Sequence, residues 1–420
     1  MSRAKPTTLV VLLVLAIGIN YLDRGSLSVA KPALAAEYAL NPTQMGFLFS
    51  AFFWSYALFQ LVSGWLVDRY DVKWVYAGGF VLWSAATLAM SFFSTFAAFF
   101  ALRLLLGIGE SVAYPATSRI LAEHLPEDRR GLANGLIDAG SKLGPALSTL
   151  LGGLVVAEYG WRALFLVLGV ASFFWLIPWI ALVPSQGRPG VDAAATTPPE
   201  PAITLLELLR RREVWGTSLG MFCLGFVWYF LLSWLPSYLV DARGFSLSSM
   251  AVLGSLPFWA MAGTTAFGGW LSDRWIRGGM SPTRVRKGFL IAGFSLCAVF
   301  MFPAAVVTNA SLSVALLVAA CASLGIYTSN VWAVTQSLAG RRAAGNWTGL
   351  QNCIGNFGGV VSPLLTGWIV TQTQSYLLAF AAASVVLLAG IFAYVLLVPK
   401  IETLTWAPTS ATPTGTAGRT

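Results

Sequence analysis

The 420-residue sequence is poor in charge and in histidine. Charged residues make up only 10% of it, hydrophobic residues make up 57%, and His124 is the single histidine. A soluble globular protein of this length does not need so much apolar surface. The chain has no second imidazole to complete a metal site or a catalytic pair, and no HExxH sequence. An enzyme that works inside the membrane is therefore disfavoured.

Cysteine is also scarce. The four cysteines, Cys223, Cys297, Cys321 and Cys353, all fall in long apolar runs and show no CxxC or Cys/His spacing. That pattern is typical of thiols that fill a hydrophobic core, and it predicts neither a disulfide nor a set of metal ligands. We expect no metal and no cofactor.

Long apolar runs, in contrast, are abundant. The first is not a cleaved signal peptide, because it lacks a small-residue cleavage site and continues into the charged pair Asp23-Arg24. Each run has about 20 residues, enough to cross the hydrocarbon layer of a bilayer as a helix. About twelve are present, near residues 8–33, 45–67, 74–93, 96–121, 132–156, 162–183, 215–240, 248–271, 288–307, 311–338, 346–370 and 375–398.

Basic residues predict the orientation of these spans. About twenty of the 26 Lys and Arg residues fall on one side, and only Lys31, Arg162 and Arg243 flank the other. Because basic loops stay in the cytoplasm, we expect both termini there and the protein in the cell (inner or plasma) membrane. The net charge of +9 then reflects topology and implies no nucleic-acid partner.

One loop pattern occurs twice. The chain reads GWLVDRYDVKW from residue 64 and GWLSDRWIRGG from residue 269. The shared residues are Gly64, Asp68 and Arg69 in the first copy and Gly269, Asp273 and Arg274 in the second. A duplicated six-helix unit explains this spacing. Transporters built from such parallel repeats bind their substrate at mid-membrane between the two halves.

The longest hydrophilic segment, rich in Pro, Gly, Ala and Thr, lies between the two copies. The last residues of the chain have a similar low-complexity composition. We therefore expect an N-terminal six-helix bundle in residues 1–183, a cytoplasmic linker in 184–213, a C-terminal six-helix bundle in 214–400 and a disordered cytoplasmic tail in 401–420.

With this repeated loop, the chain resembles the major facilitator superfamily over nearly its whole length. The resemblance implies an all-α integral membrane protein with twelve transmembrane helices in two six-helix bundles. It also implies that the two loops form a cytoplasmic gate. The gating residues would be Gly64, Asp68, Arg69, Asp273 and Arg274.

Away from the span ends, ionisable residues in the predicted spans are confined to the first half. They are Asp23, Arg24, Arg103, Glu110, Asp138 and Lys142, and their formal charges cancel. Each costs on the order of 3 kcal/mol at the centre of a span, so a functional site facing the bundle interior is the default interpretation. An acid substrate that competes for a cation would leave a carboxylate without its partner, and that carboxylate would then take up a proton.

Arg103 and Glu110 lie two helical turns apart, so both side chains leave the same face of one helix. They can line one cavity, or they can serve as a structural ion pair with a neighbouring helix. Gly107 and Gly109 between them are expected to let a neighbouring helix approach that stretch closely.

Three segments, NYLDRGSLSVAKP, FFWSYALFQ and RLLLGIGES, resemble the anion:cation symporter branch of the superfamily, which includes bacterial hexonate, hexuronate and glucarate permeases. The resemblance implies that Asp23 and Glu110 handle protons and that Arg24 controls or accompanies them. It further implies that Arg103 faces the substrate carboxylate or pairs with an acid. The residues expected to line the sugar-acid site are Tyr21 and Tyr56.

The fifth span carries Asp138 and Lys142 four residues apart, where they can form an intrahelical pair that neutralises itself. In an alternative interpretation, Lys142 is a second cation that binds a dicarboxylate substrate, and Asp138 pairs with Lys142 until that substrate arrives. Asp138 is also a candidate for proton coupling.

The second half offers polar groups without charge. Asn352 and Asn356 share one face of the eleventh span beside Gln351, and the seventh span contains Tyr229. Amides and hydroxyls suit a polyhydroxylated ligand, although such groups also hydrogen-bond helices together. We favour substrate binding for Tyr229, Asn352 and Asn356.

The sequence thus predicts a proton-coupled secondary transporter that imports a small organic anion by alternating access. A sugar acid, meaning a hexonate, hexuronate or aldarate, is the favoured substrate. Aromatic carboxylates or tartrate-like diacids would satisfy the same cations, and a proton-driven exporter of drugs or metabolites would share the fold. The expected partners are the anion, protons and the lipid bilayer, and we expect a monomer.

Overall fold

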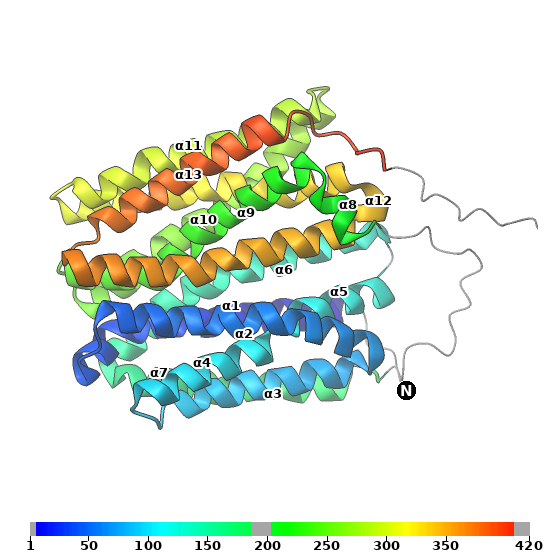
Figure 1. Ribbon diagram of the computed structural model, residues 1–420. Helices are drawn as coiled ribbons and strands as arrows, with labels where there is room; N and C mark the ends of the chain where they lie inside the picture. Colours follow the sequence, from blue (N-terminus) through cyan, green and yellow to red (C-terminus); the bar gives the residue numbers. More distant parts are fainter. Residues whose placement is uncertain (1–5, 126, 186–202, 407–420) are drawn as a thin grey trace, which may run out of the picture.

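The computed structural model describes residues 6–125, 127–185 and 203–406, and every element in these ranges is a helix. The long helices run side by side from one end of the molecule to the other, and α1 begins at the same end at which α13 finishes (Figure 1). The elements are α1 Pro6–Tyr38, α2 Pro42–Arg69, α3 Val72–Met90, α4 Phe96–Glu110, α5 Ala113–His124, α6 Glu127–Leu147, η1 Ser148–Gly152, α7 Gly153–Leu182, α8 Leu205–Leu209, α9 Arg212–Ser237, η2 Tyr238–Ala242, α10 Leu247–Arg277, α11 Pro282–Val306, α12 Ala310–Thr373 and α13 Leu377–Leu397.

The predicted spans are confirmed as helices. Over the described residues, nine helices are long and apolar enough to cross a membrane. One of them, the continuous run Ala133–Leu182, contains two crossings because two helices join at Gly160. With α2 and α3, which are helical over the predicted spans, the described helices account for the twelve crossings.

Single glycines connect two pairs of consecutive crossings. Gly160 has φ +80° and ψ 168°, and Gly340 has φ +60° and ψ −173°, in runs that are otherwise helical. Glycine alone adopts this region of backbone space without steric cost. Each glycine therefore ends one crossing and starts the next within the length of a single residue.

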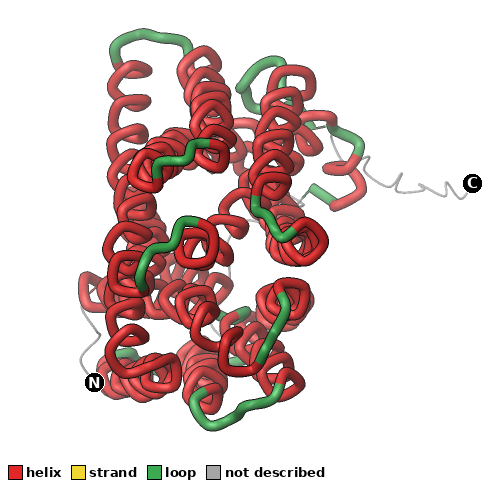
Figure 2. Tube along the Cα trace, turned by 90° about the vertical axis from the view of Figure 1, so that its left-hand side faces the viewer, coloured by secondary structure: helices red, strands yellow, loops and turns green. Residues whose placement is uncertain are grey.

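The helices form two bundles, as predicted. In the first, α1 contacts α6 and α7, while α3 contacts α4 and α7; in the second, α9 and α11 each contact α12 and α13. The bundles meet where α2 contacts α12, α1 contacts α9, and α6 and α7 contact α10. Figure 2 shows this arrangement with many helices seen nearly end-on. The interior between the bundles is thus lined by α1 and α2 on one side and α9 and α12 on the other.

One seam between the bundles depends on how α2 begins. Asn41 and Gln44 form a capping box, in which each side chain accepts a hydrogen bond from the other residue's backbone N–H. The backbone N–H of Thr43, within this first turn, donates to Thr371 Oγ1 on α12 at 3.0 Å, and the two threonine hydroxyls lie 2.8 Å apart. The cap therefore fixes both the helix start and its contact with the second bundle.

An ion pair joins the bundles near the same end. Lys31 Nζ on α1 lies 2.5 Å from Asp241 Oδ2 on η2 and 5.6 Å from the centroid of the Trp234 ring. The hydroxyl of Tyr376 donates to the same carboxylate oxygen at 3.2 Å. Lys31, predicted to flank the outer side, is thus an interior residue whose side chain is only 6% exposed.

The opposite end carries most of the described basic residues. Arg69 ends α2 and Arg274 lies in the last turn of α10, at the end where α1 begins. Of the predicted linker, residues 184–185 and 203–213 are described, and they contain the short helix α8 and the start of α9. The remaining predictions fall outside the described residues: Arg3, Lys5, the side chains of Arg129, Arg130, Arg341 and Arg342, and the predicted disorder of residues 407–420.

The close approach predicted from Gly107 and Gly109 is confirmed. A Cβ atom on Gly107 would lie 2.3 Å from the carbonyl oxygen of Phe52 on α2. A Cβ atom on Gly109 would lie 2.8 Å from the carbonyl oxygen of Gly79 on α3. Helix α4 therefore packs backbone to backbone against two neighbours, directly beside Glu110.

Replacement of Gly79 by Ala should destabilise the protein, because the new Cβ would lie 2.3 Å from Val112 Cγ1 and 2.8 Å from the carbonyl oxygen of Gly109. Overpacking of this kind costs about 1–3 kcal/mol. Gly78→Ala is the matched control, since nothing lies within 4 Å of its added Cβ. Thermal unfolding of the purified variants should show a lower midpoint for Gly79→Ala alone. Equal midpoints would contradict the described α3–α4 contact.

Candidate functional site

Five polar or charged side chains are buried near mid-membrane in the first bundle. Asp23 and Arg24 lie close to the middle of α1, and Glu110 ends α4, midway along the crossing that α4 and α5 share. Asn20 precedes Asp23 by about one turn on α1, and Arg103 lies two turns before Glu110 on α4. Their exposed fractions are 0% for Asn20, Asp23 and Glu110, 4% for Arg24 and 2% for Arg103.

Arg24 is the partner of Glu110. Its Nε donates to Glu110 Oε2 at 2.7 Å. Its guanidinium carbon also lies 4.6 Å from the ring centroid of Tyr21, 4.8 Å from that of Phe52 and 4.5 Å from that of Tyr56. The cation is thus held by one carboxylate and three aromatic faces, an arrangement that keeps it charged in a buried place.

Arg103 and Asp23 are bound less completely. Arg103 Nε donates to the carbonyl oxygen of Leu48 at 3.3 Å, and its guanidinium carbon lies 5.2 Å from the Phe52 ring centroid. Within the described part of the chain, Arg103 Nη1 and both carboxylate oxygens of Asp23 have no hydrogen-bond partner. A buried ionised group without a partner costs several kcal/mol. An anion at Arg103 and a proton on Asp23 would each lower this cost.

The structure brings Arg103 and Glu110 into one cluster, but it does not pair them. Phe52 lies against both guanidinium groups. Glu110 and Arg103 still interact electrostatically, as do Asp23 and Arg103. Four of the six predicted intramembrane charges, two of each sign, therefore share one interior region.

The remaining two charges lie on α6. Lys142 Nζ is 2.8 Å from Asp138 Oδ1 and 3.0 Å from Ser141 Oγ, so the predicted intrahelical pair is formed. Lys142 also interacts electrostatically with Tyr21, one of the rings that face Arg24. The pair is therefore next to the central cluster and not remote from it.

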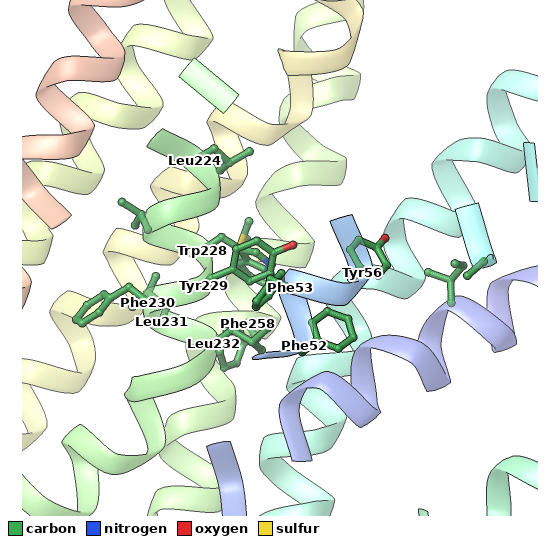
Figure 3. Close-up of a cluster of buried hydrophobic side chains, with 14 of the residues drawn as sticks. Phe52, Phe53, Tyr56, Leu224, Trp228, Tyr229, Phe230, Leu231, Leu232 and Phe258 are labelled. Carbon is green, nitrogen blue, oxygen red and sulfur yellow. The ribbon is translucent and has the colours of Figure 1, made fainter. Parts of the chain in front are cut away.

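The second bundle reaches the cluster through Tyr229. Its hydroxyl donates to Asn356 Oδ1 at 3.1 Å, and Asn356 Nδ2 donates to the carbonyl oxygen of Asn352 at 2.9 Å. Figure 3 shows Tyr229 beside Phe53 of α2, and their ring centroids are 4.3 Å apart. Tyr229 is also close enough to Arg24 to interact with it electrostatically.

Gln351 has a different environment from the two asparagines. It is fully buried and accepts a hydrogen bond from Thr335 Oγ1 at 2.5 Å, which joins the two crossings within α12. This contact fits the alternative interpretation, in which an amide hydrogen-bonds two helices together. Asn352 and Asn356 remain the amides on the face that Tyr229 contacts.

The predicted gating residues lie away from this cluster. Gly64 and Arg69 are in the last turns of α2, and Arg69 lies over the Trp65 ring. Asp273 and Arg274 are near the end of α10, where Asp273 interacts electrostatically with Arg286 of α11. The side chain of Asp68 is outside the described residues.

Two features of the site were missed by sequence reasoning. Asn20 could have been found, because it is a polar residue one turn before Asp23 in an apolar run. Phe52 gave no signal, because a phenylalanine in a membrane span is ordinarily a lipid-facing or core residue.

The sequence GTSLG at residues 216–220 has the GxSxG spacing of a hydrolase nucleophile elbow. It lies inside α9, whereas such an elbow needs a strand-to-helix turn.

A cluster of paired and unpaired charges, buried in one of two helical bundles and reached by a polar group of the other, defines a membrane transporter with an interior polar site. Comparison with known proteins agrees. The family description "Major Facilitator Superfamily" matches residues 13–363, and the chain belongs to this superfamily. It is thus an integral membrane transporter and not an enzyme.

Three curated relatives come from Bacillus subtilis (strain 168). The chain is 31% identical to the "Uncharacterized transporter YybO", over 91% of this chain and 92% of that protein. It is 31% identical to the "Probable galactarate/D-glucarate transporter GudP" (94% and 92%) and 30% identical to the "Hexuronate transporter" (89% and 90%).

A solved structure has the same fold. It is a bacterial homologue of the human lysosomal transporter Spinster in an inward-facing and unoccupied conformation, with a TM-score of 0.82 and 18% identity, covering 96% of this chain and all of that chain. The inward-facing and occupied form gives a TM-score of 0.80 at 18% identity, over 94% and 98%.

Replacement of Arg24 by Met should destabilise the protein strongly, because it leaves Glu110 buried beside no partner cation on α1. Breaking a buried pair in this way costs about 3–5 kcal/mol. The double variant Arg24→Met/Glu110→Gln should recover part of the loss in thermal unfolding. Arg162→Met serves as control, since Arg162 and Glu37 form an exposed pair, with side chains 45% and 41% exposed, that should contribute about 0–1 kcal/mol. Strictly additive effects of the two central substitutions would contradict the pairing.

Proposed function

We propose that this protein imports a sugar acid together with at least one proton, by alternating access between the two sides of the membrane. The observation that carries the proposal is the buried cluster in which Arg24 and Glu110 form an ion pair, whereas Arg103 Nη1 and both carboxylate oxygens of Asp23 have no partner among the described residues. The names of relatives at about 30% identity, which include hexuronate and probable galactarate/D-glucarate transporters, support the same substrate class.

Arg103 is the proposed anchor for the substrate carboxylate. Its guanidinium is planar and stays charged when buried, so it can meet a carboxylate with two parallel hydrogen bonds. Only its Nε is used in the described structure, on a backbone carbonyl at 3.3 Å. Carboxylate binding at this cation therefore displaces no strong existing contact.

Asp23 and Glu110 are the proposed proton carriers, with Asp138 as a further candidate. When the substrate carboxylate draws Arg103 or Arg24 toward itself, a nearby carboxylate loses attraction from its cation and gains affinity for a proton. Coupled proton entry also has an electrical benefit. An inside-negative potential opposes entry of an anion by about 2.3 kcal/mol per charge per 100 mV, which a co-transported proton offsets.

Hydroxyl and amide groups are proposed to recognise the rest of the sugar chain. Tyr21 and Tyr56 supply phenol groups from the first bundle, beside Arg24. Tyr229, Asn352 and Asn356 supply a phenol and two amides from the second. A polyhydroxylated ligand would thus touch both bundles, so that its binding can bias their relative position.

The proposed division of the chain follows the sequence boundaries. Residues 1–183 and 214–400 form the two moving bundles, 184–213 form the linker and 401–420 form the tail. We infer that both termini are cytoplasmic in the cell membrane, because basic residues gather at the end where α1 begins. Gly64, Asp68, Arg69, Asp273 and Arg274 would then gate the cytoplasmic side, and one monomer would contain a complete pathway.

Glu110→Gln should abolish uphill accumulation of a sugar acid in proteoliposomes under an imposed pH gradient, while downhill exchange persists. The reason is that an amide cannot take up and release the coupled proton. Glu158→Gln, which changes an exposed carboxylate, should accumulate substrate as the unmodified protein does. A Glu110→Gln variant that still concentrates substrate would remove Glu110 from coupling.

Arg103→Gln should weaken binding of sugar acids by about tenfold or more, the effect of losing charge-assisted hydrogen bonds worth about 1.5–3 kcal/mol. Titration of the purified protein measures the dissociation constant directly. Arg162→Gln, at an exposed arginine near the end of the molecule, should leave it unchanged. Unchanged affinity in Arg103→Gln would exclude Arg103 as the anchor.

A further inference from the structure

The Asp138–Lys142 pair on α6 is exposed unequally. The Lys142 side chain is 14% exposed and that of Asp138 is 40% exposed, although their charged atoms lie 2.8 Å apart. Asp138 is therefore the less enclosed member of the pair and is freer to move away than Lys142. A second carboxylate could replace Asp138 on Lys142, because it would return to the amine the negative charge that Asp138 withdraws.

Such a pair does not by itself explain a lysine at this depth. Lys142 lies near the middle of the crossing that runs from α6 through η1 to Gly160. An ionised lysine at this depth is costly, and an apolar pair in place of Lys142 and Asp138 would usually be no less stable. The retained pair therefore marks Lys142 as a functional residue beyond the neutralisation of Asp138.

The packing of α6 brings Lys142 beside the central cluster. Gly140 and Gly144 lie directly against α1: a Cβ atom on Gly144 would be 2.6 Å from Tyr21 Cβ, and one on Gly140 would be 3.0 Å from the carbonyl oxygen of Val14. Lys142, between these contacts in sequence, interacts electrostatically with Tyr21. Because the Tyr21 ring also faces Arg24 at 4.6 Å, one aromatic residue stands next to both cations.

We propose that Lys142 binds the second carboxylate of a sugar diacid, so that the preferred substrate of the site is a hexaric acid with a carboxylate at each end. This inference rests on the proposed function and narrows it. One end of the diacid meets the arginines of the central cluster, and the other end takes the place of Asp138 on Lys142. A sugar acid with a single carboxylate leaves the Asp138–Lys142 pair intact.

The test compares galactarate, a diacid, with galacturonate, which has one carboxylate and the same number of carbons. Dissociation constants for both are measured by calorimetric titration of the purified full-length protein and of three variants, Lys142→Gln, Lys142→Arg and Asp138→Asn. Thermal unfolding of each variant without ligand reports folding separately from binding.

The proposal expects Lys142→Gln to weaken galactarate binding by about tenfold or more and to change galacturonate binding by less than about twofold, because one charge-assisted contact is lost. Lys142→Arg should restore the preference for the diacid, and Asp138→Asn should keep or strengthen it, since Lys142 is then free of its competitor.

Equal weakening of both ligands in Lys142→Gln, or no change in either, would overturn the proposal and leave Lys142 as a member of a structural pair. Binding of galacturonate but not galactarate by the unmodified protein would overturn it too, while sugar-acid transport would stand. If the unmodified protein binds neither acid, the proposed function itself fails and this inference fails with it.

Discussion

The pairing of Arg24 with Glu110 is the constraint around which the first bundle is built. A membrane interior admits a charge only where another charge, a dipole or an aromatic face compensates for lost water. Three helices supply that compensation here: α1 carries the cation, α4 the carboxylate and α2 the rings of Phe52 and Tyr56. Their close approach depends on small residues, since Gly107 of α4 lies against the α2 backbone. Packing and electrostatics therefore support the same arrangement.

Charge and hydrogen bonding are divided between the two bundles. The six ionisable residues away from the span ends belong to the first bundle, and the second meets them with Tyr229 and its amide partner Asn356. The bundles also touch near the end opposite the start of α1, through Lys31 with Asp241 and Thr43 with Thr371. These contacts are polar, which suits the proposed alternating access.

Much of the fold could be predicted from the sequence, because the bilayer imposes a length and a composition on each crossing. The apolar runs located the helices to within a few residues. The connections were harder to predict, because Gly160 and Gly340 each join two crossings in one residue. Hydropathy does not distinguish such a glycine from one inside a helix.

The charged residues of the site were all identifiable from the sequence, because they stand out in apolar surroundings. Phe52 lies against both arginines, but in the sequence it resembles every other aromatic residue of its span.

The sequence by itself determined that the chain crosses the membrane repeatedly in two related halves, and that three acids and three bases lie away from the ends of its first-half spans. Composition and periodicity describe one helix at a time, so they identify the crossings and their charged residues but no contact between helices. Which acid meets which base was decided only by tertiary structure, since helix spacing put Arg103 on the same face as Glu110, yet in the folded protein Glu110 pairs with Arg24 of α1. Partner choice depends on how helices approach each other, and that distance is set by small residues on both surfaces together.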